Sequence, residues 1–268
     1  MAREIGIPPC PAILARFSQE IGKPEPDIRA LAHLIGADVA LAGALLKLVN
    51  SPFYGLRAKA SNTHQALSII GLRSAAQLVT GLILRQAFPA SSGPLMQRFW
   101  DRVAGHASLA MLLARKLPGM DPDMAHTYAL FQDCGIPLMI RKFPGYAGTL
   151  DKMEQLPGAD LVRDEDMRYR YNHARVGYAL ARGWLLSETF CQTILRHHEV
   201  EKFALGHRDV EAADRRLMAF GMLLEQLARL QAGRGLCPDW PDGEQFVLET
   251  LAISPDDVIA LAGDANVA

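Results

Sequence analysis

Apolar residues recur along the chain at spacings of three and four positions, the period of one face of an α-helix. In the segment 39–49, Leu41, Leu45 and Leu48 share such a face, and Asp38 directly before it can cap the helix start. Comparable caps stand before other apolar segments: Asp27, Asn62 or Thr63, and Ser254. The helix that opens at Asn62 or Thr63 is expected to be short and to end at Gly71. The sequence lacks convincing period-two alternation, which is typical of a half-buried β-strand. The pattern therefore predicts an all-α fold.

Two breaks in the helical pattern predict where domains meet. Small residues and prolines fill the stretch 89–94, which cannot continue a preceding helix. A second break, 233–243, holds two prolines between its terminal glycines. We therefore expect an N-terminal helical bundle at 1–89, a second helical subdomain at 95–232 and a short C-terminal helical appendage at 244–268.

The composition is typical of a folded globular chain, since half of its 268 residues are hydrophobic. Lys and Arg number 28 and Asp and Glu 29, which gives a formal net charge of −1. This balance leaves no long-range positive field of the kind that gathers nucleic-acid backbone or anionic lipid. General nucleic-acid binding is therefore disfavoured.

Cysteine spacing and the apolar runs together predict a cytoplasmic protein with no membrane partner. The four cysteines are widely spaced without a Cys-x-x-Cys pair, so we interpret them as reduced thiols. The N-terminus, Met1–Ile7, carries charge and lacks the pattern of a signal peptide. No apolar run is expected to reach membrane-spanning length, because Lys47 interrupts the best candidate, Leu41–Val49.

Two polar residues follow apolar helix faces and are candidates for a functional site. His106 falls in line with Phe99, Val103 and Ala110 on one face. A core histidine that is hydrogen-bonded to a backbone carbonyl is the commoner explanation of such a position. Asp133 also follows an apolar turn, where a carboxylate is costly unless it is compensated, and a helix cap is the alternative.

Three further histidines stand at the ends of predicted helices. His173 opens a helix whose inward face carries Val176 and Leu180, and His197-His198 closes the next helix. Adjacent helical residues point about 100° apart, so only one of that pair can face inward unless the helix has already ended. Four inward polar groups on four helices favour a common site more than any one of them does.

The N-terminal half contains a series of motifs in a characteristic order. They are Ile7-Pro8-Pro9-Cys10-Pro11, the segment 37–41, Leu45 to Val49 with its exit Asn50-Ser51-Pro52-Phe53-Tyr54-Gly55, and the segments 61–66 and 67–73. The chain resembles the HDOD domain, the HD-related output domain of bacterial signalling proteins, from about Ile7 to His198. The resemblance implies that the subdomain at 95–232 is HD-like. It also implies a non-catalytic signal-transduction module that acts through a signalling protein partner or by self-association.

The related HD phosphohydrolases hold a divalent metal with a His, a His-Asp dipeptide and a distant Asp, and HD-GYP phosphodiesterases add further histidines. By this resemblance, the matching positions of a degenerate metal site are His106, Asp133, His173, His197 and His198. Gln132 stands where the His of the dipeptide is expected. The distant Asp has no match, because its helix reads Met218–Met222 and Asp214 is out of register.

These departures change the expected chemistry. The amide oxygen of Gln132 is a weak ligand for zinc-like ions, and the missing carboxylate removes negative charge. Because hydrolysis needs a metal-activated water, we expect no catalysis and no cofactor. A weakly held divalent metal, a phosphate approached by Arg196, and a buried polar network all stay open. The alternative function is a metal-dependent phosphohydrolase acting on a nucleotide or cyclic dinucleotide.

Overall fold

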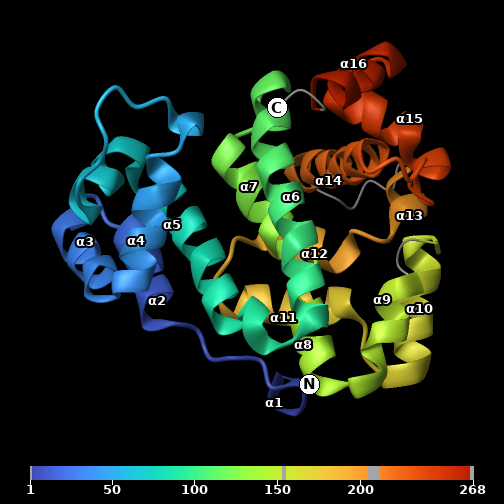
Figure 1. Ribbon diagram of the computed structural model, residues 1–268, viewed down its shortest axis with the longest axis horizontal. Coiled ribbons are helices and arrows are strands. Elements are labelled where there is room, and N and C mark those ends of the chain that lie inside the picture. Colours follow the sequence, from blue (N-terminus) through green and yellow to red (C-terminus); the bar gives the residue numbers. More distant parts are fainter. Residues whose placement is uncertain (1, 153–154, 205–211, 266–268) are drawn as a thin grey trace. The chain divides into compact units, whose positions relative to one another are not determined.

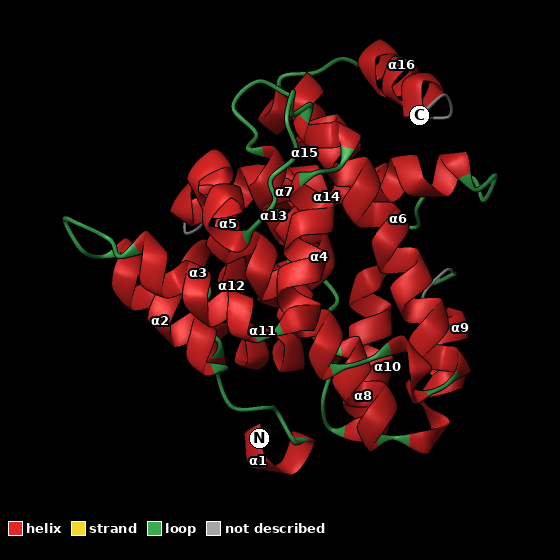
Figure 2. Cartoon of the chain, turned by 60° about the vertical axis from the view of Figure 1, so that its left-hand side comes forward, coloured by secondary structure: helices red, strands yellow, loops and turns green. Residues whose placement is uncertain are grey.

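The computed structural model describes residues 2–152, 155–204 and 212–265, and every regular element within them is a helix (Figure 2). The predicted all-α fold is confirmed. Residues 1 and 266–268 of the expected terminal domains lie outside the described ranges, as do 153–154 and 205–211 of the expected central subdomain.

The chain divides into two compact units. The smaller unit comprises Pro8–Pro89 with Gly183–Leu185, and the larger unit comprises Met1–Ile7, Ala90–Arg182 and Leu186–Ala268. The change of unit after Pro89 falls within the first predicted break. The expected appendage groups with the larger unit, because its apolar side chains, such as those of Phe246 and Val258, join the same buried core.

Three helices of the smaller unit begin at capping residues that the sequence indicated. The elements of this unit are α2 (Ala12–Ile21), α3 (Ile28–Ala37), α4 (Val39–Val49), the 3-10 turn η1 (Pro52–Tyr54) and α5 (Thr63–Ala87), blue to cyan in Figure 1. The side chains of Asp27, Asp38 and Asn62 accept hydrogen bonds from N–H groups in the first turns of α3, α4 and α5. These caps satisfy donors that a helix start leaves without partners.

A single side chain closes the loop that follows α4. Asn50 donates to the carbonyl oxygen of Ala60 at 2.9 Å and accepts from the Ala60 N–H at 2.8 Å. Within this loop Gly55 adopts a left-handed conformation with φ of 58°, which costs a glycine little. The predicted tight exit from α4 is therefore confirmed.

The long helix α5 is bent at Gly71, where φ of 78° and ψ of 165° lie outside the helical region. The sequence predicted a helix end at this glycine. The structure adds that a second helical segment follows directly and continues to Ala87. A glycine tolerates this conformation because it has no Cβ, so the two helical segments can meet at this single non-helical residue.

The same region corrects the expectation about membrane-spanning length. The stretch Thr63–Ser92 is long and apolar enough to cross a membrane by length and composition, with mean hydropathy of 1.6 in its best window. Its buried residues include Leu78, Val79 and Leu84, which lie in the core of the smaller unit. Burial inside a protein is a common cause of such hydropathy in a core helix.

The larger unit contains the helices that carry the candidate site. They are α6 (Pro94–Lys116), α7 (Pro122–Phe131), α8 (Ile136–Lys142), α9 (Ala147–Lys152), α10 (Gly158–Tyr169), α11 (His173–Gly183), α12 (Glu188–Arg196), α13 (Val200–Ala204), α14 (Ala212–Gln231), α15 (Trp240–Leu251) and α16 (Pro255–Ala265), with the short α1 (Ala2–Ile5), η2 (Ala90–Ser92) and η3 (Pro144–Tyr146). Helices α6, α7, α14, α15 and α16 share one apolar core, to which Tyr128, Phe220 and Leu223 contribute. The candidate site lies at the turn after α7, the start of α11 and the end of α12.

Candidate metal centre

Asp133 is positioned by the short turn between α7 and α8. Gly135 in this turn packs so closely on the start of α11 that a Cβ atom at this position would lie 2.0 Å from the carbonyl oxygen of His173. Gly177, one turn further along α11, leaves room for the same turn, since its own Cβ would lie 3.2 Å from the sulfur of Cys134. Two glycines thus allow the backbone contact that brings Asp133 beside His173.

His173 is oriented by a buried carboxylate. Its Nδ1 lies 2.8 Å from Oε2 of Glu165, and the same oxygen accepts the His173 backbone N–H at 2.9 Å. Both side chains are fully buried, and Tyr146 donates its hydroxyl to the other oxygen of Glu165. With Nδ1 bound to the carboxylate, the Nε2 atom is the one directed at the other candidate ligands.

The buried contact between Glu165 and His173 also shifts the pKa of each side chain. Burial raises the pKa of the Glu165 carboxyl, but His173 and the hydrogen bonds outweigh burial and hold the pKa below its usual value. Burial lowers the pKa of His173, yet the Glu165 carboxylate reverses the effect and raises it. The pair is therefore an ionised carboxylate facing an imidazole, the arrangement that commonly supports a metal-binding histidine.

Both His197 and His198 reach the site, because α12 ends at Arg196 and the two residues follow it. His197 holds its Nδ1 2.7 Å from the carbonyl oxygen of Ile194, which fixes Nε2 as the atom free to bind a ligand. His198 packs on Gly158, where a Cβ would lie 1.9 Å from the Nδ1 atom of His198. The condition that the sequence placed on this pair, an early helix end, is met.

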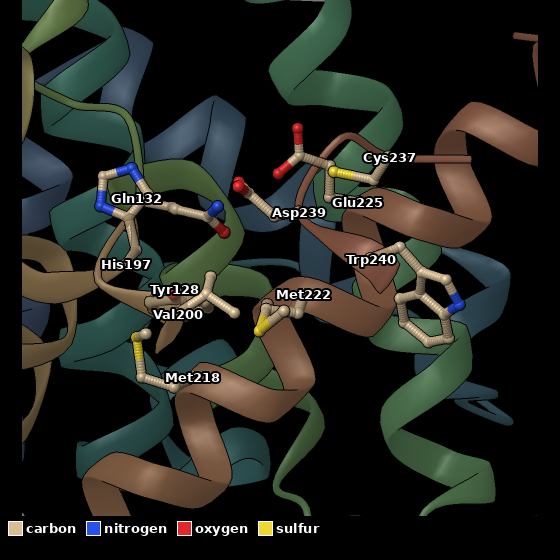
Figure 3. A pocket seen from close by; sticks show the side chains of 11 residues that line it. Tyr128, Gln132, His197, Val200, Met218, Met222, Glu225, Cys237, Asp239 and Trp240 are labelled. Atoms are coloured by element: carbon tan, nitrogen blue, oxygen red, sulfur yellow. The ribbon is translucent and has the colours of Figure 1, made fainter. Parts of the chain in front are cut away.

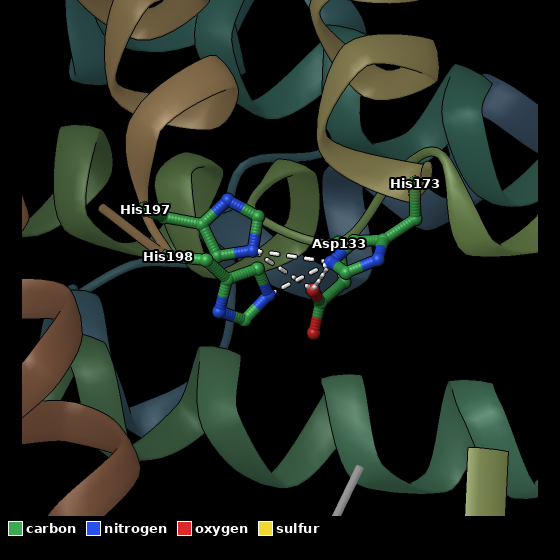
Figure 4. Close-up of side chains that lie close together, drawn as sticks. All are labelled: Asp133, His173, His197 and His198. Carbon is green, nitrogen blue, oxygen red and sulfur yellow. Dashed lines mark hydrogen bonds and ion pairs between the residues drawn. The ribbon is translucent and has the colours of Figure 1, made fainter. Parts of the chain in front are cut away.

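The candidate ligand atoms converge on one point (Figure 4). The Nε2 of His173 lies 2.9 Å from that of His198 and 3.4 Å from that of His197. Oδ1 of Asp133 lies 3.4 Å from Nε2 of His197 and 3.6 Å from Nε2 of His173. All four atoms lie within 4.8 Å of one another.

This spacing fits a metal ion. Ligands that bind zinc tetrahedrally at about 2.0–2.2 Å are about 3.4 Å apart, close to the distances measured here. Three imidazole nitrogens and one carboxylate oxygen also form a donor set that suits zinc and similar divalent ions. The residues present therefore fit the kind of metal that the related phosphohydrolases bind.

Asp133 has a second partner besides the histidines. The Nη2 of Arg102, on α6, lies 2.9 Å from its Oδ2. Burial raises the pKa of the Asp133 carboxyl, but Arg102 and the neighbouring imidazoles outweigh it and hold the pKa well below its usual value. Asp133 is therefore a carboxylate shared between a guanidinium and the histidines, and its side chain does not cap α8.

The structure brings four of the five candidate residues together and leaves His106 out of the cluster. His106 is half-buried on α6, and burial together with Arg102 lowers its pKa to about 4. Gln132 lines a cavity of about 10 Å³ with His197, Asp239 and Glu225 (Figure 3), and also a cavity of about 20 Å³ that reaches Asp133 and His198. The position of the second family histidine is therefore beside the cluster.

At position 221 of the matching helix, the structure leaves little space for the distant carboxylate of the related phosphohydrolases. In α14, a Cβ on Gly221 would already lie 2.8 Å from the ring of Tyr128. Asp214 is buried at the start of α14 and is not one of the four clustered residues. Asp239 approaches the region instead, accepting the Gly158 N–H at 3.0 Å.

Sequence reasoning missed Glu165 and Arg102, which hold the cluster from outside. A signal for Glu165 existed, since it follows Leu161 by one helical turn and both are buried on the same face of α10. Arg102 lies one turn before His106 on α6. Its link to Asp133 joins residues 31 positions apart and left no local pattern.

Comparison with known proteins identifies the family. The model of the HDOD domain matches residues 7–200. A curated protein of Treponema pallidum (strain Nichols), named "Uncharacterized protein", is 26% identical over 196 residues, which cover 72% of this chain and 38% of that protein. The chain thus spans 38% of the length of this relative.

Solved structures share the fold at low sequence identity. The HDOD domain protein with unknown function from Geobacter sulfurreducens is 20% identical, with a TM-score of 0.64 over 97% of this chain and 92% of that chain. A protein from Shewanella amazonensis SB2B printed as "Putative phosphohydrolase" is also 20% identical, with a TM-score of 0.66 over 98% of this chain and 91% of that chain. The match over residues 7–200 covers more than half of the sequence, and the chain belongs to the HDOD domain family.

Proposed function

We propose that this chain is a non-catalytic signal-transduction module whose histidine cluster holds a divalent metal for a structural or sensing purpose. The observation that carries the proposal is the set of four potential ligand atoms that lie within 4.8 Å of one another. Structural zinc sites are closed by four protein ligands, whereas catalytic sites keep one position for water or substrate. A bound metal would supply a rigid link between the ligands here.

The environment of the cluster also works against hydrolysis. Arg102 already neutralises part of the charge on Asp133, which reduces what that carboxylate contributes to a metal. Gln132 offers a neutral amide where the resemblance calls for an imidazole. A hydrolytic centre must hold its metal firmly and expose a water to the phosphorus atom, and these residues favour neither requirement.

In this proposal, the module transmits its signal by contact with a signalling protein partner or with a second copy of this chain. We locate this activity in the cytoplasm, since the four cysteines are free thiols, as a reducing compartment requires. Purification with a tagged chain as bait and measurement of the mass in solution would identify the two kinds of contact.

Metal analysis of protein purified without chelator, paired with phosphodiesterase assays, tests the proposal. We expect about one zinc-like ion per chain and no turnover in the wild type. The variant Gln132→His restores the family dipeptide and serves as the comparison for activity. Turnover by the wild type with stoichiometric metal would overturn the non-catalytic function, and a chain without metal in any preparation would overturn the metal site.

One observation favours the alternative, a metal-dependent phosphohydrolase acting on a nucleotide or cyclic dinucleotide. Burial raises the pKa values of Glu225 and Asp239, and both line the cavity beside His197. A carboxylic acid with a raised pKa can donate a proton to a leaving group. In that case Glu225→Gln would abolish a turnover that the wild type shows.

A further inference from the structure

A large cleft in the larger unit is lined by cationic side chains. It lies between α6 and α14 and has a volume of about 590 Å³. The basic residues along it are Arg98, Arg102, His106, Arg229 and Arg234. Two acidic residues, Asp101 and Glu225, line the same cleft. Two of the four arginines, Arg98 and Arg102, are also paired with carboxylates outside the lining, Asp151 at 3.1 Å and Asp133 at 2.9 Å.

Helical spacing explains how these side chains gather. On α6, Arg98, Arg102 and His106 follow one another at intervals of four residues and so share a face. On α14, Arg229 is held by a hydrogen bond of 3.4 Å from its Nη2 to the carbonyl oxygen of Arg234, which follows the end of the helix. The two faces oppose each other across the cleft.

The size and charge of the cleft indicate the class of ligand. Pockets for small organic ligands usually measure about 300–1,000 Å³, and this cleft falls within that range. Guanidinium groups bind phosphate oxygens through paired, charge-assisted hydrogen bonds. A chain with a net charge of −1 has no general excess of positive charge, so the gathering of four arginines here is local.

Arg102 connects the cleft with the histidine cluster. It lines the cleft, and its Nη2 lies 2.9 Å from Oδ2 of Asp133. It also lines a cavity of about 20 Å³ that reaches Asp133 and His198. One side chain can therefore contact a ligand in the cleft on one side and a metal ligand on the other.

We propose that this cleft binds a small phosphorylated molecule and that Arg102 couples its binding to metal binding at the cluster. A phosphate group competes with Asp133 for the guanidinium of Arg102. When Arg102 turns to the phosphate, Asp133 keeps more negative charge for a metal ion, so each ligand raises the affinity for the other. The coupling rests on the proposed metal site, whereas binding in the cleft does not.

Titration calorimetry with metal-free protein tests the cleft. Inorganic pyrophosphate and ATP are the probes, and adenosine shows whether the phosphate or the nucleoside is recognised. We expect pyrophosphate and ATP to bind and adenosine not to bind. Losing a charge-assisted hydrogen bond in Arg229→Ala should weaken pyrophosphate binding by at least about tenfold. Arg115→Ala removes the same charge from α6 away from the cleft and is the matched control.

The coupling is tested through variants, because pyrophosphate itself binds divalent metals. Cobalt titrations followed by visible absorption report affinity at the cluster. Arg102→Ala should weaken pyrophosphate binding and tighten cobalt binding, whereas Arg229→Ala should change pyrophosphate binding alone. Circular dichroism verifies that each variant is folded.

The outcomes separate the two proposals. Equal pyrophosphate affinity in the wild type, Arg229→Ala and Arg115→Ala, or no binding at all, would refute phosphate binding in the cleft. Unchanged cobalt affinity in Arg102→Ala would refute the coupling. Pyrophosphate binding without cobalt binding in any variant would support phosphate binding in the cleft and refute the metal site.

Discussion

His173 is the residue on which the geometry of the candidate metal centre depends most. It contacts Glu165 through Nδ1 and presents Nε2 to the other three ligands, so its ring is held from both sides. The backbone carbonyl of the same residue lies against Gly135, two residues after Asp133, and this contact places Asp133 beside His173. His173 therefore contributes an oriented imidazole and also, through its backbone, fixes the position of the Asp133 carboxylate.

Glu165→Gln tests this arrangement. The amide keeps the size of the side chain but loses the negative charge that fixes the His173 tautomer, and such outer partners are worth about 10–100-fold in metal affinity. We expect zinc affinity, measured by competition with a coloured chelator, to fall within that range. Glu188→Gln, an exposed change on α12, should leave affinity unaltered. Equal affinities in both variants would show that Glu165 has no positioning effect.

Single residues also show how far sequence reasoning reaches. Caps such as Asp27 and Asp38 act on the turn that follows them, so local sequence predicted them correctly. Asp133 and His173 stood out because they are polar residues on apolar faces. That they meet, and that His106 stays apart, depends on how α7, α11 and α12 pack together, which no local pattern records.

At the scale of the elements, α5 combines two helical segments across a glycine. The φ of 78° and ψ of 165° at Gly71 belong to a region that only glycine enters readily. Sequence predicted the break because glycine disfavours helix, but it could not predict that the helix resumes at once. That continuation depends on burial of residues such as Leu78 and Leu84 in the smaller unit.

Gly71→Ala should destabilise the protein by about 1–3 kcal/mol, because alanine in this conformation is strained although no neighbouring atom obstructs its Cβ. Urea unfolding followed by circular dichroism measures the change. The control is Gly43→Ala on α4, which is exposed and helical and should stabilise by up to about 1 kcal/mol. Equal effects of the two substitutions would mean that Gly71 is not held in the bent conformation.

At the scale of the whole molecule, a metal at the cluster would stabilise the larger unit directly. Its four ligands come from the turn before α8, the start of α11 and the residues after α12, all within the larger unit. A metal that binds only the folded state stabilises it in proportion to the logarithm of its concentration. The smaller unit supplies none of these ligands.

Hydrogen exchange with and without zinc tests this confinement. At a zinc concentration one hundred times the dissociation constant, the expected stabilisation is about 2.7 kcal/mol. Amides of α11 and α12 should gain protection, whereas those of α3 and α4 serve as the internal control and should not change. His173→Ala should remove the gain. Protection that spreads equally over α3 and α4, or persists in the variant, would contradict a metal held at this cluster.

The division into units has a consequence for the order in which the chain is made. The smaller unit is nearly continuous, from Pro8 to Pro89, so most of it is synthesised before the main part of the larger unit, which starts at Ala90. The core of the larger unit joins Ala107 to Leu261, and α14 and α16 pack on α6. Because domains tend to fold as they emerge, we expect α6 to keep part of its apolar face exposed until α14 and α16 have been synthesised. Chaperones that shield apolar segments during translation would therefore act on this helix.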